Sequence, residues 1–264
     1  MRKYLSVFGL AARGSLWKGL AVTVLAAALA GLLLFLLPQQ EMNPYYAGPG
    51  EKSEEVLSSY IFMEAAQDSC ASIPLMVGFA ALCAVLAGTG WGKGAKTGYT
   101  VARLRVKKNT ACLLWTAYDF MALLLYWAVS AGVLLFAMVL RMKNVSPGGE
   151  LDPLTLILTC YSTPLLHHLL PVGNVYAWGG NILGILACAV GCADVAEKKW
   201  RGQLGGIPLA IAVALTVVGF FVRLQNSGAQ ALYMAAQAAL IGIVLYGWWG
   251  GDKREETDMA AQRP

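Results

Sequence analysis

The sequence feature that most constrains the fold is an apolar run at residues 19–37 that holds no charged residue. A helix of about 20 apolar residues is what crosses the roughly 30 Å hydrocarbon core of a bilayer. The run follows a basic amino-terminal stretch and continues past a small-residue motif at 28–30, which favours a retained membrane helix over a cleaved signal peptide. We therefore expect a chain that lies in a membrane.

The composition supports this expectation. Hydrophobic residues make up 58% of the chain and charged residues 13%, whereas soluble domains are about 45–50% apolar and about 25% charged. This balance excludes a soluble enzyme, a disordered tail and a nucleic-acid-binding protein. The net charge of +5 is then best interpreted through the positions of Lys and Arg along the chain.

Five further apolar segments follow the first one. The sequence predicts an all-α polytopic helix bundle at 19–249, between a cytoplasmic amphipathic segment at 1–18 and a cytoplasmic tail at 250–264. The six transmembrane helices are predicted at residues 19–37, 73–89, 111–140, 175–193, 206–222 and 230–249.

The basic residues predict the orientation of these spans. With the amino terminus inside, sixteen of the twenty Lys and Arg residues fall on the inner side. Loops rich in Lys and Arg stay in the cytoplasm. We therefore expect a multi-pass protein of the cell membrane with both termini in the cytoplasm.

Two segments do not fit a plain series of crossings. Residues 38–72 form a long acidic outer loop, and residues 154–171 are apolar but contain Pro164 and end at Pro171. A full crossing by 154–171 would reverse the charge asymmetry, so we expect an interfacial or re-entrant element on the outer face, before the fourth span. Cys70 and Cys160 both fall on this side, and whether they form a disulfide stays open.

The densest basic run lies in the predicted cytoplasmic loop at 91–110. Its glycine-rich beginning departs from a phosphate-binding loop because the last glycine before the lysine is missing and a membrane helix precedes it. The cations that follow are interleaved with apolar residues, which is consistent with anchoring to anionic headgroups or with docking on a partner protein. The residues expected to contact such a partner are Lys96, Tyr99, Arg103, Arg105, Lys107 and Lys108.

One ionisable residue clearly falls inside a predicted span. Asp119 is expected to face the bundle interior, because a carboxylate in hydrocarbon is costly, and Asn181 or Gln237 could form a hydrogen bond with it. A functional role and a structural pairing are equally consistent with the sequence.

The remaining candidates for chemistry are weak. His167 and His168 are adjacent, so on a helix they point about 100° apart and cannot easily share one metal ion. Cys188 and Cys192 share a helix face, where free cysteines act as small hydrophobic residues. No nucleophile motif, zinc motif or carboxylate pair is present, so we expect no enzyme, no cofactor and no metal site.

The layout resembles a known family. A basic segment at 1–19 precedes six spans, and a cytoplasmic loop with GAKTGYTVARLRVKK separates the second span from the third. This arrangement is similar to that of the membrane subunits of ABC-2-type transporters, including permease-like proteins of anaerobic Gram-positive bacteria. The family's outer hairpin usually lies between the fifth and sixth spans, where this chain has only the short segment 223–229.

The resemblance implies a function and partners. In that family the loop after the second span is received by a separate ABC ATPase, and two membrane subunits, identical or different, form the substrate path. The sequence thus predicts a permease subunit that contacts an ATPase, a second membrane subunit and the lipid bilayer, with no nucleic acid. The alternative is a non-transporting accessory or sensor protein whose acidic outer loop binds a ligand.

Overall fold

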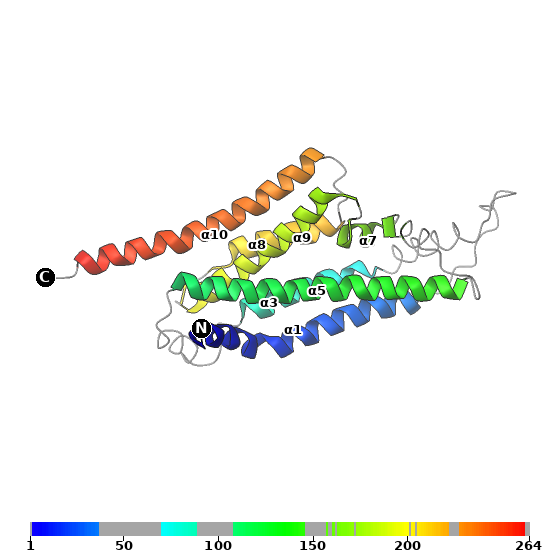
Figure 1. Ribbon diagram of the computed structural model, residues 1–264, viewed down its shortest axis with the longest axis horizontal. Coiled ribbons are helices and arrows are strands. Elements are labelled where there is room, and N and C mark those ends of the chain that lie inside the picture. Colours follow the sequence, from blue (N-terminus) through cyan, green and yellow to red (C-terminus); the bar gives the residue numbers. More distant parts are fainter. Residues whose placement is uncertain are drawn as a thin grey trace.

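The chain, in a computed structural model, is helical over the residues that the structure describes, which confirms the predicted all-α class. Those residues are 2–36, 70–88, 108–145, 157, 160–161, 163–171, 173–200, 202–203, 205–221 and 227–261. Their helices, labelled as in Figure 1, are α1 (Arg2–Leu36), α3 (Ser72–Ala87), α5 (Lys108–Val145), α7 (Pro164–Leu169), α8 (Val175–Trp200), α9 (Ile207–Phe221) and α10 (Ser227–Ala261).

Four of these helices are long and apolar enough to cross a membrane, which indicates a membrane protein. The candidate spans are Ser6–Phe35, Lys108–Leu140, Val175–Lys199 and Gly228–Trp249. Helix α3 has 16 residues and α9 has 15, so each extends only about 24 Å or less at 1.5 Å per residue. The structure therefore supports four of the six predicted crossings by length.

The long helices extend past the predicted spans. Helix α1 joins the segment at 1–18 to the first span without a break, and α10 continues from the sixth span into the predicted tail. Helix α8 runs on beyond 193 to Trp200. An apolar run marks the thickness of the hydrocarbon layer rather than the length of the helix, so a helix can continue beyond the span that the sequence predicts.

Helix α8 is the centre of the bundle. It packs against α3, α5, α9 and α10, while α1 packs against α3 and α5. Of its apolar stretch, 72% is buried inside the molecule, against 11% for α10. Figure 1 accordingly shows α10 along one edge, with its carboxyl end extending beyond the other helices.

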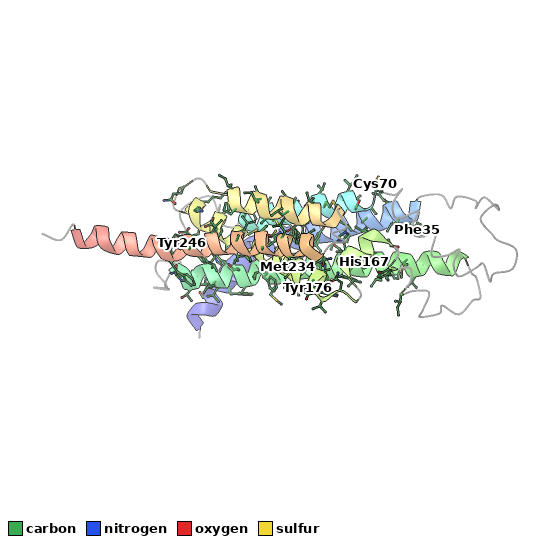
Figure 2. The ribbon with its side chains drawn as sticks, turned by 90° about the horizontal axis from the view of Figure 1, so that it is seen from above. Phe35, Cys70, His167, Tyr176, Met234 and Tyr246 are labelled. Atoms are coloured by element: carbon green, nitrogen blue, oxygen red, sulfur yellow. The ribbon has the colours of Figure 1, made fainter. Side chains whose placement is uncertain are left out.

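The bundle has two distinct ends. We call the end where α1 and α5 begin the basal end; α8 also finishes there (Figure 1). We call the other end, where α8 and α10 begin, the pocket end. Figure 2 shows Phe35, Cys70 and His167 toward the pocket end and Tyr246 toward the basal end.

The core consists of two apolar clusters. The larger one surrounds α8, and the smaller one includes Leu34, Leu134 and Leu166. Helix α7 contributes Leu166 and Leu169 to the smaller cluster and contacts α5 and α9. Within the segment at 154–171, the structure thus places a six-residue helix among the ends of longer ones.

Candidate functional site

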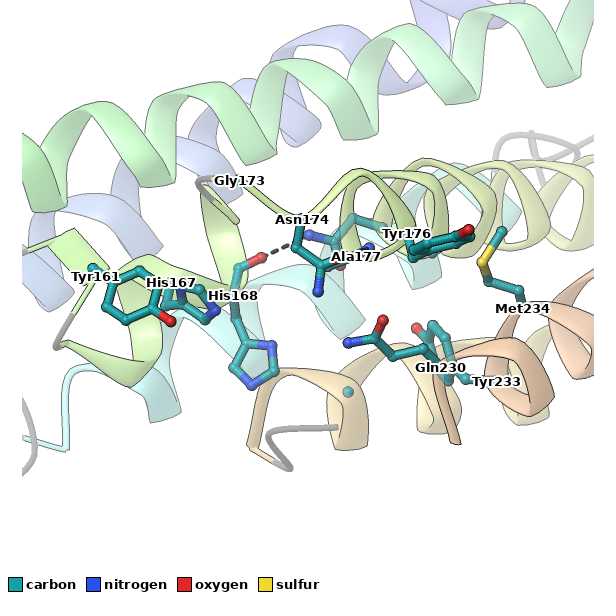
Figure 3. A pocket seen from close by; sticks show the side chains of 13 residues that line it. Tyr161, His167, His168, Gly173, Asn174, Tyr176, Ala177, Gln230, Tyr233 and Met234 are labelled. Atoms are coloured by element: carbon teal, nitrogen blue, oxygen red, sulfur yellow. Dashed lines mark hydrogen bonds between the residues drawn. The ribbon is translucent and has the colours of Figure 1, made fainter. Parts of the chain in front are cut away.

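A polar pocket of about 460 Å³ opens at the pocket end, between the segment that carries α7 and the helices α8, α9 and α10. Figure 3 shows it from close by. Its floor and walls combine small residues with side chains that form hydrogen bonds. The polar residues among those that line it are Tyr161, His167, His168, Asn174, Tyr176, Asn181, Gln230 and Tyr233.

The turn between α7 and α8 positions one wall of the pocket. Gly173 has a φ of +82°, a conformation that glycine adopts without strain. Asn174 then caps α8, because its Oδ1 accepts a hydrogen bond from the backbone N–H of Ala177 at 3.2 Å. The Asn174 side chain and Gln230 extend into the pocket from opposite sides (Figure 3).

Two contacts fix the histidines. Asn181 donates a hydrogen bond from Nδ2 to the backbone oxygen of His168 at 2.6 Å, which ties the end of α7 to α8. The His167 ring lies edge-on to Tyr161, with ring centroids 4.9 Å apart. The two adjacent histidines both line the pocket.

Tyr233 forms the floor of the pocket and fills a recess lined by glycines. A Cβ atom added at Gly184 or at Gly219 would lie 3.2 Å from the Tyr233 hydroxyl, and one at Gly180 would lie 3.5 Å from its ring. We call this space the Tyr233 recess. The glycines on α8 and α9 therefore let the ring lie close to both helices.

A fully buried polar group lies one helical turn past Tyr233. Gln237 is 0% exposed and donates a hydrogen bond from Nε2 to Thr216 Oγ1 at 3.4 Å. The Cys188 sulfur lies 3.6 Å from the same hydroxyl. The three side chains join α8, α9 and α10 below the pocket.

Asn181 and Gln237, which could have formed a hydrogen bond with Asp119, have other partners. Asn181 bonds to the His168 carbonyl, and Gln237 bonds to Thr216. Asp119 is buried, as expected, and α5 and α8 run antiparallel (Figure 1). At 1.5 Å per residue, Asp119 lies about 16 Å along α5 from Lys108, which pairs with Glu197. Asn181 lies about 24 Å along α8 from Glu197.

The predicted partner-binding residues fall mostly outside the described residues. Five of the six lie outside the residues that the structure describes, namely Lys96, Tyr99, Arg103, Arg105 and Lys107. The sixth one, at position 108, begins α5 and forms an ion pair through its Nζ with Oε1 of Glu197 at 3.2 Å.

Sequence reasoning missed two buried acids at the basal end. Asp194 and Glu197 are 2% and 4% exposed, because α8 continues past the predicted end of the fourth span. Asp194 pairs with Lys198 at 2.7 Å and accepts a hydrogen bond from Trp248 Nε1 at 3.3 Å. The spacing of positions 194, 197 and 198 places them on one helix face, which is the signal that could have revealed them.

The described residues contain neither a disulfide nor a cluster of metal-binding side chains. All six cysteines are free, including Cys70 and Cys160. In the same part of the chain, no group of three or more His, Cys, Asp or Glu residues could hold a metal ion.

Comparison with known proteins leaves the chain without an assigned relative. No family model, no curated protein and no solved structure matches it.

Proposed function

We propose that this chain is a membrane permease subunit that works with a separate cytoplasmic ABC ATPase. Four helices of spanning length, two shorter apolar helices and a polar pocket at one end of the bundle support a role in transport. The basic loop at 91–110 is the proposed docking site for the ATPase, and a second membrane subunit would complete the substrate path.

The observation that carries the proposal is the polar junction at the basal end. Lys108, at the end of the basic run, pairs with Glu197 on α8. Asp194, one turn before, bonds to Trp248 on α10. Helices α8 and α10 line the pocket at their other ends, so a displacement of the loop would be transmitted along two rigid helices to the pocket.

The proposed topology has six crossings, with both termini in the cytoplasm. In this arrangement the basal end faces the cytoplasm and the pocket faces outward, in accordance with the bias of Lys and Arg. Helices as short as α3 and α9 would cross where the bilayer thins or where flanking residues add length.

The test is purification of the tagged protein from its native membranes after mild crosslinking. We expect an ABC ATPase to copurify with measurable ATP hydrolysis, and the double variant Arg103→Glu, Arg105→Glu to lower its yield at least tenfold, because the loop then repels a partner that receives cations. Arg13→Glu, at an exposed position on α1, is the matched control. If no ATPase copurifies, or if the double variant retains it, the proposal is wrong.

The second candidate is a membrane sensor or accessory protein, and the closed floor of the pocket favours it. Tyr233 separates the pocket from the buried groups below, as a binding site without a path would require. Deletion of residues 41–60 in the acidic outer loop would then abolish the response to ligand and leave any ATPase association intact.

A further inference from the structure

The pocket presents many hydrogen-bond donors and no carboxylate. Among the described residues that line it, none is Asp, Glu, Lys or Arg. Its nitrogen-bearing side chains are His167, His168, Asn174, Asn181 and Gln230. Imidazole and amide N–H groups, with the tyrosine hydroxyls, can donate to a ligand. These lining residues therefore carry no fixed charge of either sign, and a ligand rich in acceptor oxygens would find N–H and O–H donors on several sides.

The backbone adds to this preference. Helices α8 and α10 both begin at the pocket, and residues within the first turn or so of each line it, namely Tyr176, Ala177 and Gln230. The amino end of a helix carries a partial positive charge. Asn174 already accepts from one N–H of α8, and the partial positive charge of the two helix ends beside the cavity adds to the effect of the side-chain donors.

The shape and the fixed geometry indicate what kind of anion fits. The donors come from α7, α8 and α10, so they surround the cavity instead of forming one flat pair. A tetrahedral phosphate offers acceptor oxygens in several directions, which suits this arrangement better than a planar carboxylate. The volume of about 460 Å³ also holds part of the group that carries the phosphate.

We propose that the pocket binds a phosphate group, carried by a soluble phosphate ester or by a lipid headgroup, between the two histidines and the amides of α8 and α10. The Asn181 bond to the His168 carbonyl holds α7 in place before the ligand arrives, which lowers the cost of ordering the site. The inference rests on the proposed function only for the role of the ligand as substrate.

The first experiment measures binding to the purified full chain in maltoside micelles that contain no phosphate. One arm titrates glycerol 3-phosphate by calorimetry, and the other titrates phosphatidylglycerol by native mass spectrometry. Saturable one-to-one binding in either arm supports the proposal and identifies the source of the phosphate. No saturable binding in both arms, or equal binding of glycerol and diacylglycerol, which lack the phosphate, overturns it.

The second experiment locates the site. His168→Ala removes a donor and Ala177→Phe fills the cavity from α8, so each is expected to weaken binding at least tenfold. Ala177→Phe adds bulk on the open side and keeps the test valid if His168→Ala does not fold. Tyr246→Ala, on the exposed far part of α10, is the control and should bind as the unchanged chain does. Unchanged affinity in a folded Ala177→Phe protein overturns the proposal.

The binding result and the transport result can be told apart. If phosphate binds but no ATPase copurifies, the ligand class stands and the permease function fails. If an ATPase copurifies but phosphate does not bind, the ligand class is wrong and the permease function stands.

Discussion

At the scale of single residues, Gly78 shows how closely these helices approach one another. A Cβ atom at Gly78 on α3 would overlap both the Cβ of Ala26 on α1 and the hydroxyl of Tyr126 on α5. The same hydroxyl donates a hydrogen bond to the backbone oxygen of Leu75. One glycine therefore permits a contact of three helices and a buried hydrogen bond.

Gly78→Ala is expected to destabilise the protein by about 1–3 kcal/mol, the usual cost of overpacking a core. Either α1 moves away or Tyr126 loses its bond to Leu75, and both changes weaken the bundle. Thermal unfolding in detergent measures the effect. Gly132→Ala is the control, since nothing lies within 4 Å of a Cβ there. Equal stability of the two variants would contradict the close packing.

At the scale of elements, the basal junction fixes how α5 meets α8. The side chains of Lys108 and Glu197 are 18% and 5% exposed, so solvent screens their attraction less than at an open surface. Position 108 begins α5 and position 197 lies in the last turn of α8. The ion pair thus fixes the start of α5 beside the end of α8, although the two residues are far apart in the sequence.

Lys108→Met is expected to lower stability by about 2 kcal/mol, between the values for exposed and for buried ion pairs. The substitution keeps the apolar stem and removes the charge that faces Glu197. The charge-swapped double variant Lys108→Glu, Glu197→Lys should recover at least half of the loss in a thermal unfolding assay.

Lys18→Met, at an exposed position on α1, serves as the control for this pair. It removes one lysine without touching Glu197 and should leave the unfolding temperature nearly unchanged. If Lys18→Met lowered the unfolding temperature as much as Lys108→Met does, the removal of any lysine charge, rather than the loss of the ion pair, would explain the effect.

Apolar runs in the sequence predicted the four helices of spanning length and the two shorter apolar helices, because burial in hydrocarbon leaves a direct trace in composition. They did not predict where α8 ends, because Asp194 and Glu197 look like water-exposed residues until Lys108 and Trp248 are placed beside them. Such partners come from other helices and leave no local pattern.

The pocket could not be predicted for a related reason. Its histidines, amides and tyrosines come from four separate segments, and none of them forms a motif along the chain. The sequence identified Asn181 as a polar residue within a span but did not identify His168 as its partner. That contact depends on how α7 lies against α8 in the fold.

At the scale of the whole molecule, α8 is surrounded and α10 lies at the edge. The apolar side chains that α10 exposes, such as Leu232 and Ile243, would face lipid or a second membrane subunit. The cysteines differ in their exposure to solvent. Cys70 is exposed, whereas Cys83, Cys112, Cys188 and Cys192 are buried.

This division makes the orientation measurable. On intact cells a maleimide that cannot cross membranes is expected to label Cys70, because the proposed topology places the pocket end outside. Cys70→Ser should remove most of the labelling. In that background, Arg13→Cys at the basal end should react only after the cells are permeabilised. Labelling of Cys70 only after permeabilisation would reverse the proposed topology.

The Tyr233 recess also restricts how this sequence can change over evolutionary time. A Cβ atom at Gly184 or at Gly219 would lie 3.2 Å from the phenol oxygen, so a side chain at either position requires the tyrosine to shift. At Gly184 a Cβ atom would also lie 3.2 Å from Thr216 Oγ1, so a smaller residue at 233 relieves the crowding at Gly219 more fully than at Gly184. The shape of the pocket floor therefore depends on all three positions together. We expect substitutions at these positions on α8, α9 and α10 to be correlated among related sequences.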